Sequence, residues 1–149
     1  MWNNSFKIPG YVEYYRDGYF NRTPHGGVGI LVHQDIPHSR VNIRSTIQAV
    51  AVTVFMEQRI TICSVYCSGR HVLTTQSLKL LFEQLPAPIL MLGDLNGQNQ
   101  MWGSVQTDRR GQIIEEAINQ CNFDILNNGE PTRITDQSST AIDISVCSP

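Results

Sequence analysis

The chain has 149 residues, a length typical of one domain with a hydrophobic core of its own. A hydrophobic content of 41% and a charged content of 16% are ordinary for a globular protein and exclude a disordered tail. The net charge of −2 argues against a protein that coats nucleic acid by electrostatic attraction alone, but it leaves open an enzyme that recruits phosphate through a metal ion.

The compartment is inferred from the cysteines and the apolar runs. The sequence start lacks the pattern of a secretory signal, and the longest apolar runs are far shorter than the roughly 18 residues of a membrane span. The spacing of Cys63, Cys67, Cys121 and Cys147 does not match a zinc finger, so ordinary thiols are favoured over a disulfide or a metal site. We therefore expect an intracellular protein that does not enter a membrane.

The first part of the chain has two extended segments separated by turn signals. Residues 11–16 predict a short strand that is followed by a polar turn at Asp17 and Gly18. A second turn signal at residues 24–27 precedes a β-branched apolar run at residues 28–33.

Two longer β-rich runs follow, at residues 47–56 and 59–66. They are joined by Glu57 and Gln58, which predicts an antiparallel hairpin. Because both runs carry apolar side chains on both faces, we expect a sheet that is covered on both sides.

The second half of the chain adds two helical patterns. Leu78, Leu81, Phe82 and Leu85 give one apolar helical face, which Pro86 is expected to end.

A second helical stripe and three strands complete the pattern. The stripe follows Gly111 and consists of Ile113, Ile114, Ala117, Ile118 and Cys121. Strands are predicted at residues 89–92, at residues 123–126 before a turn at residues 127–129, and near residues 141–146. Five or more strands with two helices predict an α+β layered sandwich in one domain.

The stretch PILMLGDLNG joins a predicted buried strand to polar groups. In an extended chain Asp94 and Asn96 lie on the same side. A carboxylate and an amide in this position can hold a water or a metal, accept a proton and hydrogen-bond a phosphoryl oxygen. The alternative is that Asp94 opens a turn and accepts hydrogen bonds from nearby N–H groups, and the motif alone does not decide.

Two more groups of polar residues lie downstream. Arg109 and Arg110 precede the second helical stripe and are candidates for phosphate contacts, with Asp108 as the helix cap, although a solvated helix start explains the pair equally well. Asp143 stands between two isoleucines on a predicted strand, as either a site carboxylate or a satisfied polar group.

Taken as a set, these motifs resemble the motifs of one protein family. GDLNGQNQMWGS, RRGQIIEEAINQCNFDILNNGEPTRI and SSTAIDIS resemble the endonuclease domain of jockey-like non-LTR retrotransposons, a member of the endonuclease/exonuclease/phosphatase superfamily. FKIPGYVEYYRD, PHGGVGILVH and ITICSVYCSG are similar to upstream segments of the same family, so the resemblance covers essentially the whole chain. It implies a deoxyribonuclease-I-like four-layer α/β/β/α sandwich with two mixed β-sheets that face each other.

The resemblance also implies a reaction, metal-dependent hydrolysis that nicks target DNA for retrotransposition. Asp94 resembles the acid that positions and activates the attacking water, and Asn96 resembles the amide that steadies this water and the phosphate. Asp143 resembles the carboxylate that orients a catalytic His, and Tyr66 resembles a phosphate-contacting tyrosine. Asp94 and Asp143 are therefore expected side by side, facing a shared cleft.

Substrate and cofactor follow from the same resemblance. The residues predicted to bind DNA are Thr132, Arg109, Arg110 and Trp102. Mg²⁺ or Mn²⁺ is the implied cofactor, with Asp94 and Asn96 as candidate ligands, because hard divalent cations prefer oxygen donors. Fusion to a reverse transcriptase and a nuclear location are implied as well.

The sequence departs from the family pattern at both ends. The family has an Asn and a metal-binding Glu on strands upstream of FKIPGY, and a Ser-Asp-His motif on a strand beyond IDIS. Both lie outside this sequence, so we interpret residues 1–149 as a single partial domain. Glu13 stands in the wrong motif to replace the Glu, and all four histidines lie upstream of GDLN.

We therefore expect a DNA endonuclease domain that is inactive or weak as this chain. The alternatives are a phosphatase or nucleotide-processing enzyme of the same superfamily and a non-catalytic remnant.

Overall fold

The computed structural model describes residues 7–20 and 23–149, so Phe6, the first residue of FKIPGY, lies outside it. The elements in chain order are β1 (Tyr11–Phe20), β2 (Thr23–His33), β3 (His38–Val41), β4 (Gln48–Phe55), β5 (Arg59–Tyr66), α1 (Thr75–Phe82), β6 (Ile89–Asp94), the 3₁₀ turn η1 (Gln100–Trp102), α2 (Arg109–Gln120), β7 (Asp124–Ile125), β8 (Arg133–Ile134), β9 (Ser139–Thr140) and β10 (Asp143–Cys147).

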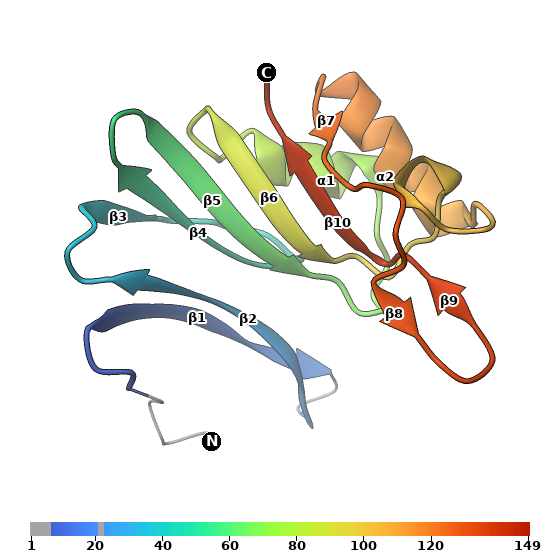
Figure 1. Cartoon of the computed structure of the whole chain (residues 1–149), viewed down its shortest axis with the longest axis horizontal. Coiled ribbons are helices and arrows are strands. Elements are labelled where there is room, and N and C mark those ends of the chain that lie inside the picture. The colour runs from blue at the N-terminus through green and yellow to red at the C-terminus, as the bar shows by residue number, and fades with distance from the viewer. Residues whose placement is uncertain (1–6, 21–22) are drawn as a thin grey trace.

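A six-stranded sheet with the order β3-β4-β5-β6-β10-β7 forms the centre of the fold (Figure 1). Its neighbouring strands are antiparallel except β5 and β6, which are parallel. Parallel neighbours need a crossover connection, and here α1 lies in that connection. The predicted α+β class with a mixed sheet is confirmed.

Both helices pack on one face of this sheet. Their predicted apolar stripes pack there against alternate residues of the strands, such as Val65 of β5 and Ile144 of β10, with Ile113 and Cys121 only partly buried. A capping box begins α1, in which Thr74 Oγ1 accepts from Ser77 N at 3.0 Å. The helix ends at Phe82, before the predicted stop at Pro86, although Leu85 is buried as predicted.

The β1–β2 hairpin covers the opposite face at β4 and β5. Val52 and Val54 of β4 form a second, smaller core there with Val32 of β2, so this part of the sheet is covered on both sides, as predicted for the two runs. The layers are therefore helices, the six-stranded sheet and the hairpin. Among residues 7–20 and 23–149, no helix covers the outer side of the hairpin.

The hairpin is longer than the local turn signals predict. Strand β1 continues through Asp17 and Gly18 with a register shift before Tyr19, and the predicted turn at residues 24–27 lies inside β2. Pairing between the two strands overrides the turn-forming residues, which produce an irregularity instead of a chain reversal. The β4–β5 hairpin is confirmed, with Phe55 opposite Arg59.

Three short strands, β3, β8 and β9, have no counterpart in the prediction, because two to four residues are too few to show a period. Neither helix of the described residues is long and apolar enough to cross a membrane.

Candidate active site

Three of the predicted site residues form a row at one end of the central sheet, the lower right end in Figure 1. Asp94, the last residue of β6, pairs in register with Asp143 of β10 and with Tyr66 of β5. Paired residues on neighbouring strands project to the same face, and adjacent strands lie about 4.8 Å apart. That face is the hairpin side, because Val65 and Ile144 belong to the core on the helix side. The expected side-by-side placement of the two aspartates is confirmed.

Asp94 also closes a turn. Its Oδ1 accepts a 2.7 Å hydrogen bond from the backbone N–H of Asn96, whose φ is 52°. The side chain of Asn96 donates to the carbonyl of Cys67 at 3.2 Å. The premise that the chain stays extended from residue 94 to 96 is therefore wrong, because the strand ends at Asp94 and Asn96 adopts the left-handed conformation.

The environment of Asp94 raises the pKa of its carboxyl group. Partial burial is the largest cause, and the neighbouring carboxylate of Asp143 acts in the same direction. The Asn96 N–H and, more weakly, Arg110 and Arg133 oppose the shift. The pair is thus a concentrated negative charge that a cation would neutralise.

Asp143 is held through its backbone by two side chains. Thr132 Oγ1 accepts hydrogen bonds from the N–H groups of Ile142 and Asp143 at 3.2 and 3.1 Å. Asn127 donates to the carbonyl of Asp143 at 3.0 Å and accepts from Ser145 N at 2.8 Å. Thr132 therefore lies at the site as a support for β10, and its hydroxyl proton is available to a ligand. The sequence marked Asn127 only as a turn residue, so its role was missed.

The described residues supply only part of a metal site. Asp94 and Asp143 offer carboxylate oxygens of the type that Mg²⁺ and Mn²⁺ prefer. Within residues 7–20 and 23–149, however, no group of three or more His, Cys, Asp or Glu residues is arranged to hold a metal ion. The chemistry of the pair fits a hard cation, but the set of ligands is incomplete.

Trp102 was predicted to bind DNA, and this prediction is wrong. Its side chain is fully buried in the helix-side core, and its indole N–H donates to the carbonyl of Gly97 at 3.2 Å. A side chain with 0% exposure, whose one polar group is already hydrogen-bonded, cannot contact a substrate at the surface.

The two adjacent arginines have different environments. The guanidinium of Arg110 donates to the carbonyls of Leu95, His71, Cys67 and Ser68, which leaves it as a link between loops instead of the predicted phosphate contact. Arg109 is exposed and lines an open groove of about 440 Å³ together with Asn96 and Val72. Asp108 caps α2, with its Oδ1 accepting from Gly111 N at 2.6 Å.

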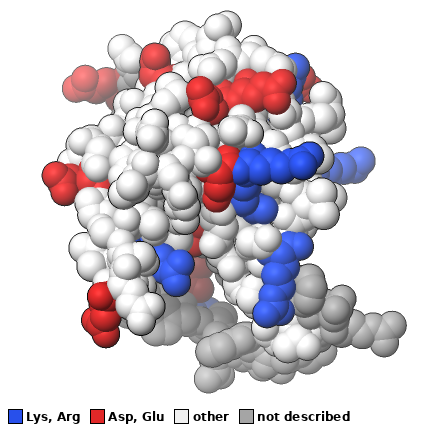
Figure 2. All heavy atoms as spheres, turned by 90° about the vertical axis from the view of Figure 1, so that its right-hand side faces the viewer, with Lys and Arg blue, Asp and Glu red and all other residues white. Residues whose placement is uncertain are grey.

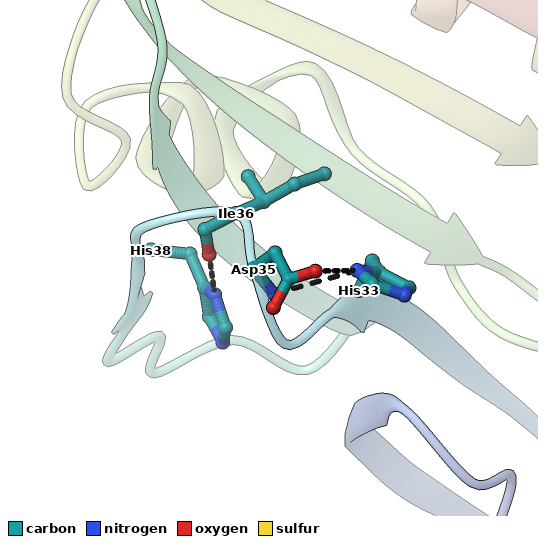
Figure 3. Close-up of polar contacts among 4 residues, drawn as sticks. All are labelled: His33, Asp35, Ile36 and His38. Carbon is teal, nitrogen blue, oxygen red and sulfur yellow. Dashed lines mark hydrogen bonds and ion pairs between the residues drawn. The ribbon is translucent and has the colours of Figure 1, made fainter.

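Two of the histidines flank the turn between β2 and β3, with His33 as the last residue of β2 and His38 as the first residue of β3 (Figure 3). His33 Nδ1 is 3.5 Å from Asp35 Oδ2, and His38 contacts the carbonyl of Ile36. His25, at the other end of β2, lies near Tyr66, with 6.4 Å between the ring centroids. The sequence carried no signal for this proximity, because it depends on how the hairpin docks.

The family of this chain follows from a match between its sequence and a protein-family model. The family described as endonuclease-reverse transcriptase matches residues 60–149, more than half of the chain. The chain belongs to this family. The family predicted from the motifs, jockey-like elements included, is confirmed by the relatives that follow.

Two curated relatives of this endonuclease-reverse transcriptase chain come from Drosophila melanogaster. The probable RNA-directed DNA polymerase from transposon X-element is 25% identical over 130 residues, and the RNA-directed DNA polymerase from mobile element jockey is 24% identical over 128 residues. These matches cover 85% and 84% of the chain but only 14% of each relative, so the chain spans a small part of their length.

A solved structure has the same fold. The endonuclease domain of TRAS1, a telomere-specific non-LTR retrotransposon, superposes with a TM-score of 0.76 at 17% identity. The superposition covers 95% of this chain and 66% of the TRAS1 domain. The predicted deoxyribonuclease-I-like class is thereby confirmed.

The charged surface of this endonuclease-family chain is mixed. Figure 2 shows basic and acidic side chains interspersed on the face at the right of Figure 1, where α2 and the β8–β9 hairpin lie. The described residues on this face form no continuous basic patch, in keeping with the net charge of −2.

The raised pKa of Asp94 leads to a stability prediction. The folded chain holds this proton more tightly than the unfolded chain, so stability falls as the pH rises from the ordinary value of 3.8 through the raised pKa. Asp94→Asn has no charge to lose and still accepts from the Asn96 N–H. We expect it to melt about 1–3 °C above the wild type near pH 7, and the difference to shrink near pH 4.

Circular dichroism melts at both pH values measure the effect. Asp136→Asn is the matched control, because Asp136 is exposed on the β8–β9 turn and should leave the melting temperature unchanged at either pH. A lower melting temperature for Asp94→Asn than for the wild type near pH 7 would contradict the expectation.

Proposed function

We propose that this domain hydrolyses phosphodiester bonds in DNA at the Asp94–Asp143 pair, with Tyr66 contacting the phosphate. The observation that carries the proposal is the in-register pairing of the two aspartates on adjacent strands beside that tyrosine. Membership in the endonuclease-reverse transcriptase family and the TRAS1-like fold support it.

The side chains have complementary roles in this proposal. Asp94 positions the attacking water and accepts its proton, because a carboxylate with a raised pKa is a stronger base. The turn to Asn96 fixes the carboxylate through Oδ1 and leaves Oδ2 for the water. Asp143 is fixed by Thr132 and Asn127 and orients a protonated partner, which the family resemblance identifies as a His outside this sequence.

A divalent cation, Mg²⁺ or Mn²⁺, is part of the proposal. Asp94 and the amide oxygen of Asn96 would hold it, together with the Glu that the resemblance places upstream. When bound, such a cation neutralises the phosphate and acts as a Lewis acid. Fusion to a reverse transcriptase is proposed because the relatives are RNA-directed DNA polymerases. Action in the nucleus is proposed from the family resemblance alone.

Relaxation of supercoiled plasmid tests the proposal. The 149-residue chain and a version extended at both ends by the flanking coding sequence are compared in Mg²⁺ and in Mn²⁺. We expect nicking by the extended protein and a rate near background for the shorter chain. Asp94→Asn in the extended protein should lower the rate by about 10² to 10⁴, whereas Asp136→Asn should not change it.

Three outcomes would count against the proposal. An extended protein that leaves plasmid intact in both metals, or one in which Asp94→Asn nicks at the wild-type rate, would overturn the assigned site. Asp94-dependent nicking by the shorter chain would refute the need for the upstream Glu and the downstream His.

The incomplete set of ligands favours one second candidate, a non-catalytic remnant that still binds DNA. It is distinguished by DNA binding without cleavage in the extended protein. Cleavage of phosphoinositides or nucleotides instead of plasmid would indicate a different substrate within the superfamily.

A further inference from the structure

The start of β2 lies against one end of the site row. Gln48 of β4 extends the row of Tyr66, Asp94 and Asp143, because it pairs in register with Tyr66. Its Nε2 donates to the carbonyl of His25 at 3.3 Å. The hairpin and the central sheet are therefore joined next to Tyr66.

The backbone at Gly26 packs directly on the tyrosine ring. Its φ is 75°, and a Cβ at this position would lie 2.3 Å from Tyr66 Cε1 and 3.1 Å from Gln48 Oε1. Only glycine allows so close an approach of the chain. One side of the ring is thus fixed by the backbone of the hairpin.

His25 makes the second contact. Its Nε2 is 3.3 Å from Ser68 Oγ, and its ring is tilted by 53° to the ring of Tyr66. Because Ser68 follows Tyr66 by two residues, His25 connects the hairpin to the chain just beyond the tyrosine. The same imidazole therefore contacts the ring and the backbone segment that carries it.

The space between these groups is too small for a nucleotide. His25, Gln48, Tyr66 and Ser68 border a cavity of about 40 Å³, which has room for water only. These side chains thus support Tyr66 and do not form a second binding site.

We propose that His25 is a positioning residue for Tyr66. Through Ser68 and the tyrosine ring it holds the phenol beside Asp94, and the benefit for catalysis rests on the phosphate contact proposed for Tyr66 above. His25 lies upstream of GDLN and acts here by holding Tyr66, so it does not replace the imidazole that the family motif places downstream.

Nuclear magnetic resonance on the 149-residue chain tests the positioning without any activity. Ring-¹³C tyrosine labels the five tyrosines, and Tyr66→Phe assigns the signal of interest. We expect His25→Ala to shift the Tyr66 signal and lower its order parameter, and His25→Gln, which can still reach Ser68, to restore part of the order. His33→Ala is the matched control: it should move Tyr11, whose ring centroid is 5.2 Å from that of His33, and leave Tyr66 unchanged.

A Tyr66 order parameter in His25→Ala equal to that of the wild type would overturn the proposal. In the extended protein, His25→Ala should lower kcat about tenfold with little change in KM, and adding it to Tyr66→Phe should give no further loss. Additive losses, or an effect no larger than that of His33→Ala, would refute the proposal. An extended protein that does not nick would refute the proposed function, and the resonance experiment would still decide the role of His25.

Discussion

Arg110→Met is expected to lower the free energy of unfolding by about 3 kcal/mol. The guanidinium donates to four carbonyls, and those of His71, Cys67 and Ser68 lie 2.8 to 3.1 Å away. Hydrogen bonds from a charged donor are worth roughly 1.5–3 kcal/mol each, but water replaces some of them at a half-buried position. Methionine keeps much of the side-chain volume and none of the donors.

Loss of the Arg110 hydrogen bonds should also make the strand ends that carry the candidate site more mobile. Arg110 connects the start of α2 to the segment after β5 and, through Leu95, to the segment after β6. Tyr66 and Asp94 are the last residues of these two strands. Without the connection, the two strand ends keep their ladder hydrogen bonds and the bond from Asn96 to the carbonyl of Cys67, but lose the charged link between the segments that follow them.

Urea unfolding followed by tryptophan fluorescence measures this effect. Arg109→Met is the matched control, because Arg109 is exposed and none of the hydrogen bonds seen among the described residues involves its side chain; we expect a change within about 0.5 kcal/mol. Arg110→Lys keeps the charge without the planar fork and should fall between the two. Equal unfolding free energies for the two methionine variants would show that the carbonyl contacts contribute nothing.

Elements with a clear period were predictable from the sequence. The faces of α1 and α2 and the β4–β5 hairpin follow from local patterns, because apolar residues repeat with the period of the element that buries them. The pairing of Asp94 with Asp143 joins residues far apart in the chain, and no local pattern contains that register. It was predictable only through the resemblance to a family.

The errors at the site concern side chains that are amphipathic. Trp102 and Arg110 belong to residue types that bind nucleic acid on a surface, yet both are used inside the fold to satisfy carbonyls. Whether such a side chain points to solvent or into the domain depends on tertiary packing, which a motif does not record. The contact of His25 with Tyr66 could not be predicted from the sequence for the same reason, because it forms only when the hairpin packs on the central sheet.

Gly93→Ala is expected to destabilise the domain by at least about 3 kcal/mol. A Cβ at Gly93 would lie 1.9 Å from the carbonyl oxygen of Val65, its partner on β5, and the φ of 150° is one that L side chains rarely adopt. Strands β5 and β6 are central in the sheet, and both belong to the helix-side core, so they cannot separate locally without disturbing that core. The clash also lies next to Asp94, so it should pull the carboxylate away from Tyr66.

Gly69→Ala is the matched control, because nothing lies within 4 Å of a Cβ at that exposed position. Urea unfolding of the two alanine variants should differ by several kcal/mol, with Gly69→Ala close to the wild type. If Gly93→Ala unfolds at the same urea concentration as Gly69→Ala, the β5–β6 pairing at Val65 is not as close as described. The register that brings Tyr66 to Asp94 would then be wrong, and the proposed site with it.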